Sequence, residues 1–365
     1  MQSSRIPVSI LKPLKGLDDE LEANLESFCH QTHPHYEIIF GVADRLDPAL
    51  AVARKVAAAH PKVASRIVVG ECPTGLNPKV RLLRALLRSA RYDAILISDS
   101  NVRVGEHYLA TTAAELEDPT VGLVSNPIIG TGASTLGSAL DNLQLNSYVI
   151  FGLTLANFIG RFACVVGKSM LLRRSSLQRI GGLGRFADVL AEDYLIGRAM
   201  RELGIGVVTC PSAIHTINKS WSLRKTWQRH LRWSQIRRSL GTPGYLLELL
   251  LLPHLWLAAT VGSLLMNPSR WSASALSSCV CVYILLCLSE TVATVRWSEQ
   301  GSGGISLLPF AALRQFGQIA LWLLAWGKSE VDWRGKKLNI AKGSKLIDRS
   351  RNAPRLSVPF ARQAA

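Results

Sequence analysis

The chain has 365 residues and a formal net charge of +16, from 42 lysine and arginine residues against 26 aspartate and glutamate residues. A chain of this length exceeds one ordinary domain and can bury a sizeable core. Its mean hydropathy of +0.18 favours membrane attachment, while the basic excess indicates contact with anionic headgroups or a phosphate-bearing substrate. No recognisable nucleic-acid-binding module accompanies the basic residues, so we expect no nucleic-acid partner.

The cysteines and the start of the chain restrict the setting in which the protein works. The seven cysteines form no CxxC pair and no zinc-ligand spacing, so we expect reduced thiols that serve as small apolar residues. Met1–Arg5 leads directly into the strand-like segment Ile6–Leu11, without a signal peptide. We therefore expect the N-terminal part of the chain to remain in the cytoplasm.

The first two thirds of the chain alternate between strand-like and helix-like segments. The predicted strands are Val8–Leu11, Tyr36–Val42, Ala64–Val69, Asp93–Ser98 and Val121–Ser125. The predicted helices are Asp18–His30, Pro48–His60, Lys79–Ala90 and Tyr194–Leu203. This order predicts an α/β fold with a mostly parallel sheet and helices on both of its faces.

Two aspartates follow predicted strands. Asp44 comes after Tyr36–Val42, and Asp99 comes directly after Asp93–Ser98. Open α/β sheets bind ligands at the carboxyl ends of their strands, so we expect both residues at one ligand site. Asp44 is either a nucleobase contact or a turn former, and Asp99 is either a metal and diphosphate ligand or a turn residue.

Two further groups carry candidate chemistry. Glu192 and Asp193 open the predicted helix Tyr194–Leu203, where an acidic pair is either a plain helix cap or, at Asp193, a general base. Lys79 follows a turn at Gly75–Pro78 and either reaches a phosphate or is an ordinary surface lysine. Neither motif is specific on its own.

Apolar segments fill the last third. Tyr245–Met266 and Ala273–Val295 are each long enough to cross about 30 Å of hydrocarbon. Ile305–Trp326 is interrupted by Pro309 and Arg314, and basic clusters lie both before the first segment and after the third. The positive-inside rule then requires an even number of crossings, so we expect two spans and one interfacial or re-entrant segment.

We therefore predict three parts of the chain: a cytosolic α/β domain (residues 1–241), a membrane region (242–327) and a basic cytosolic tail (328–365). Leu136–Ile159 has few charges, so it is either a core helix or an amphipathic helix at the membrane surface. Glu290, within the second span, either marks a helix contact or the lipid path or lies near the headgroups beside Arg296, and the last of these is expected.

Taken together, the acidic sites and the segment Arg229-His230-Leu231-Arg232-Trp233 form a specific pattern. It resembles the D, D, D, (Q/R)xxRW pattern of membrane-associated family-two glycosyltransferases, and within them the ceramide glucosyltransferases. Further similar stretches are Leu11–Gly16, Asn77-Pro78-Lys79, Ala191–Tyr194 and Trp333-Arg334-Gly335. The resemblance covers roughly Ile10 to Leu338 and is strongest before the apolar segments.

The resemblance implies a GT-A-type, Rossmann-like catalytic domain and an inverting transfer of a hexose, expected to be glucose, from a UDP-sugar. Asp44 would contact uracil, Asp99 would bind the metal and diphosphate, and Asp193 would be the base. The other implied donor-binding residues are Lys79, Arg229, Arg232 and Trp233. The implied metal is Mg²⁺ or Mn²⁺.

The implied acceptor is the primary hydroxyl of a ceramide-like lipid that reaches the site from the membrane. Glu192 and Trp233 would lie on the acceptor side. The second motif is Asp-Ser-Asn rather than DxD, so only Asp99 supplies a carboxylate, and His215 is a candidate second metal ligand. The family usually has a membrane helix before the first strand, where this chain has only the residues up to Arg5.

Other functions remain open at this point. A related transferase could act on a hopanoid or another lipid acceptor, and a processive polysaccharide synthase would need more membrane spans. Outside the enzymes, a membrane lipid-binding protein with a decayed site is the alternative, although Asp193 and Arg232-Trp233 are intact.

Overall fold

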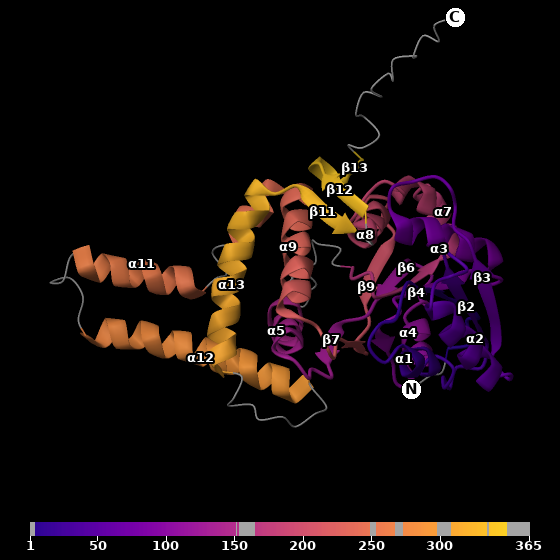
Figure 1. The fold of residues 1–365 in the computed structure, drawn as a ribbon, viewed down its shortest axis with the longest axis horizontal. Coiled ribbons are helices and arrows are strands. Elements are labelled where there is room, and N and C mark those ends of the chain that lie inside the picture. Colours follow the sequence, from indigo (N-terminus) through magenta and orange to yellow (C-terminus); the bar gives the residue numbers. More distant parts are fainter. Residues whose placement is uncertain are drawn as a thin grey trace, which may run out of the picture.

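The computed structural model describes residues 4–150, 152, 165–248, 253–266, 273–297, 308–333 and 336–348. Figure 1 shows an α/β body that contains the N-terminus, with α9 (Leu223–Leu240) and α13 (Leu308–Gly327) side by side next to it. A hairpin of α11 (Pro253–Met266) and α12 (Ala273–Trp297) projects away from that body.

A seven-stranded sheet forms the centre of the α/β body, with strand order β3-β2-β1-β4-β8-β6-β9. These strands are β1 (Val8–Pro13), β2 (Tyr36–Val42), β3 (Ala64–Val69), β4 (Ala94–Ser98), β6 (Val121–Ser125), β8 (Ser169–Arg173) and β9 (Gly206–Thr209). Strand β8 is antiparallel to both neighbours, and the remaining pairs are parallel. The five predicted strands and the mostly parallel sheet are therefore confirmed.

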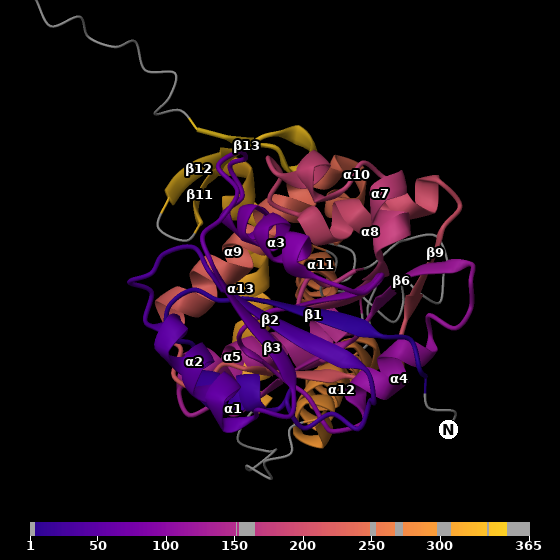
Figure 2. The ribbon, with the colours of Figure 1, turned by 90° about the vertical axis from the view of Figure 1, so that its right-hand side faces the viewer.

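Helices cover both faces of the sheet (Figure 2). One face is covered by α1 (Leu21–Glu26), α2 (Ala49–Ala59) and α4 (Tyr108–Ala114), and the other by α3 (Pro78–Ser89), α7 (Arg174–Arg179) and α8 (Glu192–Glu202). Neighbouring strand residues point to opposite faces, so Ile10 packs in the first core and Leu11 in the second. Burial on both faces explains the continuous apolar runs of these strands.

The starting points of two helices follow from local features of the chain. Helix α3 begins where the Asn77 side chain accepts hydrogen bonds from the Lys79 and Val80 N–H groups, with Pro78 in the first turn. The prediction of a helix over Asp18–His30 was too long, because Glu20 adopts a left-handed conformation (φ 52°) and α1 starts only after it.

The sequence did not reveal the shorter strands. A three-stranded sheet contains β5 (Val102–Arg103), β10 (Ile214–Ile217) and β7 (Ile128–Thr131). A second one contains β11 (Glu330–Trp333), β12 (Lys336–Ile340) and β13 (Leu346–Ile347), within the segment predicted as a basic tail. Most of these strands have only two to four residues, which leaves little room for a periodic signal.

The described part of Leu136–Ile159 is a buried helix, in agreement with the core alternative. It comprises α5 (Leu136–Gln144) and a π-helical turn, η1 (Leu145–Val149). Asp141, Leu143 and Leu145 are completely buried. Residues 151 and 153–164 lie outside the described residues.

The apolar segments form α10 (Thr242–Leu247), α11, α12 and α13. Helix α13 packs along α9, and its Arg314 donates a 2.6 Å hydrogen bond to Gln144 Oε1 of α5. Within the described ranges, no helix combines the length and the apolar character that crossing a bilayer requires. The expected spans stay predictions, and the side chain of Glu290 lies outside the described residues.

Candidate active site

Asp99 lies at the carboxyl end of β4, where it meets a buried lysine from α3. Lys79 Nζ lies 3.0 Å from Asp99 Oδ1 and 3.2 Å from Glu192 Oε1, and it donates to the Gly167 carbonyl at 3.1 Å. Burial favours a lower pKa for Lys79, but the carboxylates of Asp99 and Glu192 outweigh it and raise the pKa. An ammonium has three N–H donors, and these three acceptors can occupy all of them. Lys79 thus joins the two acidic motifs instead of presenting an open phosphate contact.

Asp193 stands in the first turn of α8 beside the same lysine. Its Oδ2 accepts from Gly167 N at 2.7 Å, and its Oδ1 accepts from Tyr194 N at 2.8 Å. A Cβ at position 167 would lie 2.7 Å from Asp193 Oδ2, so the close approach requires glycine there. Burial, reinforced by the charge of Glu192, raises the pKa of Asp193 to about 6. Such a carboxylate is mostly ionised at neutral pH and remains a competent base.

Two more lysines surround Asp99, and the sequence analysis missed both. Lys12, fully buried on β1, donates to the Asp99 carbonyl at 2.7 Å and lies over the Phe28 ring. Lys168 donates to Asn101 Oδ1 at 2.6 Å, and its Nζ lies 3.5 Å from Asp99 Oδ2. Burial lowers the pKa of Lys12 to about 7 and that of Lys168 to about 8. For Lys12, the available signal was a lysine inside an otherwise apolar strand.

A chain of hydrogen bonds links this cluster to the arginine helix α9. Asn101 Nδ2 donates to Asn218 Oδ1 at 2.9 Å, and Asn218 Nδ2 donates to Asp141 Oδ2 at 2.7 Å. Asp141 in turn contacts Arg229 Nη1 at 3.0 Å and His230 Nε2 at 2.8 Å. Burial favours a higher pKa for Asp141, but Arg229 and His230 outweigh it and hold the pKa below its ordinary value.

The two arginines of the motif face different neighbours. The Arg229 guanidinium lies 4.5 Å from the Trp233 ring centroid, and its Nη2 is buried without a hydrogen-bond partner among the described residues. The Arg232 guanidinium lies 4.8 Å from the Trp333 ring centroid of β11. Burial, together with the charge of Arg229, lowers the pKa of Arg232 to about 10. Arg229 is therefore anchored to Asp141, while Arg232 is directed toward the C-terminal sheet.

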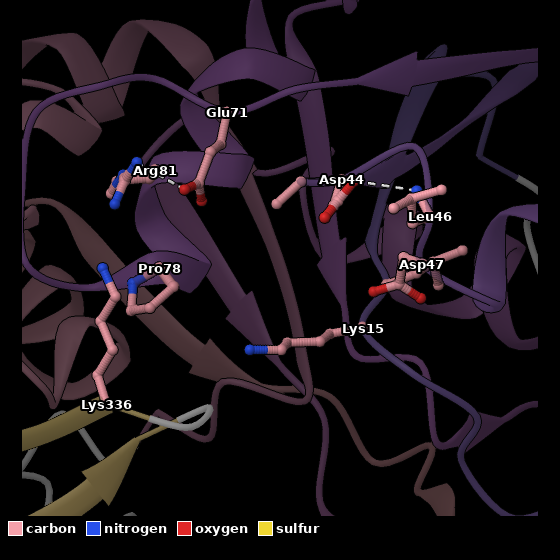
Figure 3. A pocket seen from close by; sticks show the side chains of 10 residues that line it. Lys15, Asp44, Leu46, Asp47, Glu71, Pro78, Arg81 and Lys336 are labelled. Carbon is pink, nitrogen blue, oxygen red and sulfur yellow. Dashed lines mark hydrogen bonds and ion pairs between the residues drawn. The ribbon is translucent and has the colours of Figure 1, made fainter.

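Asp44 lines a separate part of the site, a cavity of about 310 Å³ at the ends of β1 and β2. Its Oδ1 accepts from Leu46 N at 3.0 Å. Figure 3 shows Asp44 facing a space that is also bordered by Lys15, Pro78 and Lys336. Pro78, which lines this cavity, directly precedes Lys79 of the cluster around Asp99.

The C-terminal sheet holds the loop that leads to Asp193. Ser344 accepts two hydrogen bonds from this loop, both at 2.9 Å: its backbone carbonyl accepts from Leu190 N, and its side-chain Oγ accepts from Ala191 N. The opposite side of this loop is held by Asn77, whose Nδ2 donates to the Val189 carbonyl at 2.8 Å. The base is thus positioned by segments from both ends of the chain.

Ser344→Ala is expected to destabilise the protein by about 1–3 kcal/mol and to lower turnover, because the buried Ala191 N–H loses its acceptor. Unfolding midpoints and kcat measure the two effects. Ser329→Ala is the matched control, since Ser329 belongs to the same segment and, among the described residues, its Oγ donates only to Asn339 of that segment. Equal turnover of both variants would argue against a role of Ser344 in positioning the loop.

The side chains available as metal ligands decide which kind of metal site can form. Among the residues that the structure describes, no group of three or more histidine, cysteine or carboxylate side chains could hold a metal ion. His215, the expected second metal ligand, lies on β10 in register with Arg103 of β5. A Mg²⁺ or Mn²⁺ ion held mainly by substrate phosphates needs only one or two protein carboxylates, a role that Asp99 fits.

The predicted residues therefore meet as follows. Asp99, Lys79, Glu192 and Asp193 form one cluster, which a chain of hydrogen bonds connects to Arg229. Arg232 approaches through Trp333, which packs with Leu190 two residues before Glu192. Trp233 packs edge-on against His230. Asp18, whose Oδ2 accepts from Ser100 Oγ at 2.5 Å, is a further acidic residue that the sequence analysis did not select.

Comparison with known proteins agrees with this architecture. The fold is similar to that of the mannosyltransferase PcManGT from Pyrobaculum calidifontis in complex with GDP-Man and Mn²⁺, with a TM-score of 0.50 and 17% identity over 89% of this chain and 88% of that one. This likeness concerns the fold alone and confirms a GT-A-like α/β domain. The model of glycosyl transferase family 21 matches residues 1–346, and the chain belongs to this family.

Individual relatives lead to the same group. Ceramide glucosyltransferase 1 of Caenorhabditis elegans is 29% identical over 238 residues, which cover 63% of this chain and 49% of the relative. The ceramide glucosyltransferase of Komagataella phaffii is 29% identical over 298 residues, which cover 66% of this chain and 58% of the relative. The chain thus spans about half the length of the relatives it matches, and the expected resemblance to ceramide glucosyltransferases is confirmed.

Proposed function

We propose that this protein transfers a hexose, expected to be glucose, from a UDP-sugar to the primary hydroxyl of ceramide, with inversion at the sugar. The observation that carries the proposal is the meeting of Asp99 and the Glu192–Asp193 pair at one buried lysine, Lys79. The departing diphosphate and the hydroxyl that loses its proton must lie on either side of the same sugar, and this cluster supplies a group for each. Similarity to ceramide glucosyltransferases supports the choice of acceptor.

Asp193 supplies the base in this proposal. Its carboxylate takes the proton from the lipid hydroxyl while the hydroxyl oxygen forms a bond to the sugar and the bond to the diphosphate breaks. The leaving diphosphate is already a good leaving group once its charge is neutralised, so no carboxylic acid has to protonate it. Glu192 is held by Lys79 and by Asn77 Nδ2 at 3.1 Å, which leaves the proton transfer to Asp193.

Neutralisation of the diphosphate falls to the cations around Asp99. Lys168 and the Arg229 guanidinium, with its buried Nη2, are the nearest candidates on the side of α9. Asp99 would hold Mg²⁺ or Mn²⁺, which when bound supplies positive charge to the phosphate oxygens. Asp44 would accept from the uracil ring in its cavity.

We further propose that the catalytic domain faces the cytoplasm at a membrane from which the acceptor lipid enters. Support comes from large apolar side chains that are exposed on the projecting hairpin. They include Trp256 (60% exposed), Leu265 (78%) and Met266 (82%) of α11, and Leu285 (63%) and Val292 (61%) of α12. Exposed apolar surface of this extent is typical of contact with a membrane or a protein partner.

The acidic limb of the pH profile is a direct test of the base. Because the pKa of Asp193 is raised to about 6, kcat/KM is expected to rise with pH through that value. Glu192→Gln removes a negative neighbour, so the limb should move to lower pH, while the amide oxygen still accepts from Lys79. Glu202→Gln, exposed on the same helix, should leave the limb in place. A limb unmoved in Glu192→Gln would contradict the assignment.

The whole function is tested by incubating membranes that contain the protein with several labelled UDP-sugars and ceramide, followed by lipid chromatography. A labelled ceramide product from one UDP-hexose is expected. Transfer only to a hopanoid or another lipid would replace ceramide as the acceptor. Lipid binding without transfer from any donor would show a non-catalytic lipid-binding protein.

A further inference from the structure

The chain returns to the α/β body after its apolar helices. The C-terminal sheet of β11, β12 and β13 lies beside α9 and near α3 and α8 (Figures 1 and 2). Lys336, the first residue of β12, thereby borders the same cavity as Asp44, although 292 positions separate them in sequence.

Specific contacts fix the sheet in this position. Leu346 N donates to the Asp188 carbonyl at 2.8 Å, next to the contacts of Ser344 with the loop before Asp193. Val331 and Leu338 pack with Leu190 in a buried apolar cluster. Lys336 is therefore carried by a docked sheet and not by a free tail.

The charged side chains that line the cavity differ in the partners they have. Arg81 is neutralised by Glu71 at 2.6 Å, and Asp47 accepts from the backbone N–H groups of Gly16 and Ala49. Lys336 makes no ion pair with any residue in the described ranges, and its side chain extends toward the cavity beside Pro78 (Figure 3). A cation with this freedom faces a space whose far wall carries Asp44.

We propose that Lys336 binds the diphosphate of the nucleotide donor, so that the segment after the apolar helices completes the donor site. This inference rests on the proposed function. The uracil ring of the donor would lie against Asp44. Its phosphates would extend from this cavity toward the Asp99 cluster, along the side on which Lys336 lies. A lysine is a point charge for phosphate, which suits its position at the rim.

Isothermal titration of the full-length protein with UDP and with uridine tests this role. Lys336→Ala should bind UDP about tenfold more weakly, because one charge-assisted contact is lost, and should bind uridine as the wild type does. Lys336→Arg should restore most of the UDP affinity. Lys337→Ala is the matched control, since neighbouring residues of a strand point to opposite faces.

Each outcome separates this inference from the proposed function. UDP affinity unchanged in Lys336→Ala, or equal losses for UDP and uridine, would overturn the role of Lys336 while wild-type transfer stands. Tight UDP binding by the wild type without sugar transfer would overturn the proposed function alone. Failure of the wild type to bind UDP would overturn both.

Discussion

Asp193→Asn is expected to lower kcat by about 10²–10⁴-fold, the usual contribution of a general base. The asparagine keeps one oxygen, which can still accept from Gly167 N, whereas its amide nitrogen cannot accept from Tyr194 N, so only one of the two backbone contacts is retained. The amide, however, cannot take the proton of the acceptor hydroxyl. Affinity for UDP should stay close to that of the wild type, because the change removes an interaction made only in the transition state.

Parallel measurement of kcat and of UDP affinity checks this expectation. Asp188→Asn is the control, because Asp188 lies in the same loop and its Oδ1 accepts only a structural hydrogen bond from Leu76 N in the described structure. Loss of UDP affinity at normal turnover would move Asp193 from proton transfer to donor binding.

Lys79→Met is expected to destabilise the protein by about 3–5 kcal/mol, the usual effect of removing one partner of a buried ion pair. The methionine fills a similar volume, but the side chains of Glu192 (7% exposed) and Asp99 (26% exposed) lose their shared counter-charge. Activity should fall as well, since the tie between the two acidic motifs is lost. Unfolding midpoints in urea measure the effect.

Two comparisons sharpen this test. Lys55→Met removes an exposed pair with Glu22 and should leave stability close to that of the wild type. Adding Asp99→Asn and Glu192→Gln to Lys79→Met should recover part of the loss, because the buried charges disappear with their partner. Equal stability of Lys79→Met and Lys55→Met would show that the buried lysine does not hold the site together.

The fold was predictable where local patterns are strong. Tyr36–Val42 and Ala64–Val69 are apolar runs between turns, and both strands have the predicted bounds. The approach of Asp99 to the Glu192–Asp193 pair was expected from the resemblance to the glycosyltransferase pattern, and the rule for strand ends placed Asp44 and Asp99 at one edge of the sheet. Lys79, which contacts both Asp99 and Glu192, could be singled out from the sequence, but its two partners, 93 positions apart, could not be assigned.

Other parts of the site depend on contacts that no local pattern encodes. Asp141 was visible only as a lone charge in an apolar segment, and its bonds to Asn218 and Arg229 cross 77 and 88 positions. Arg229 and Arg232 are three residues apart on one helix, yet their neighbours come from α5 and β11, so their directions could not be inferred. The sheet around Lys336 lies in a basic stretch whose strands alternate too briefly to be recognised.

The anomeric configuration of the product is the most direct measurement of a single displacement by the acceptor hydroxyl, with Asp193 as its base. With α-linked UDP-glucose as donor and ceramide as acceptor, proton NMR of the purified glycolipid should show a β-glycosidic linkage. An α-linked product would mean retention, which requires a second displacement or another mechanism, and would contradict the assignment of Asp193 as the base of a direct attack.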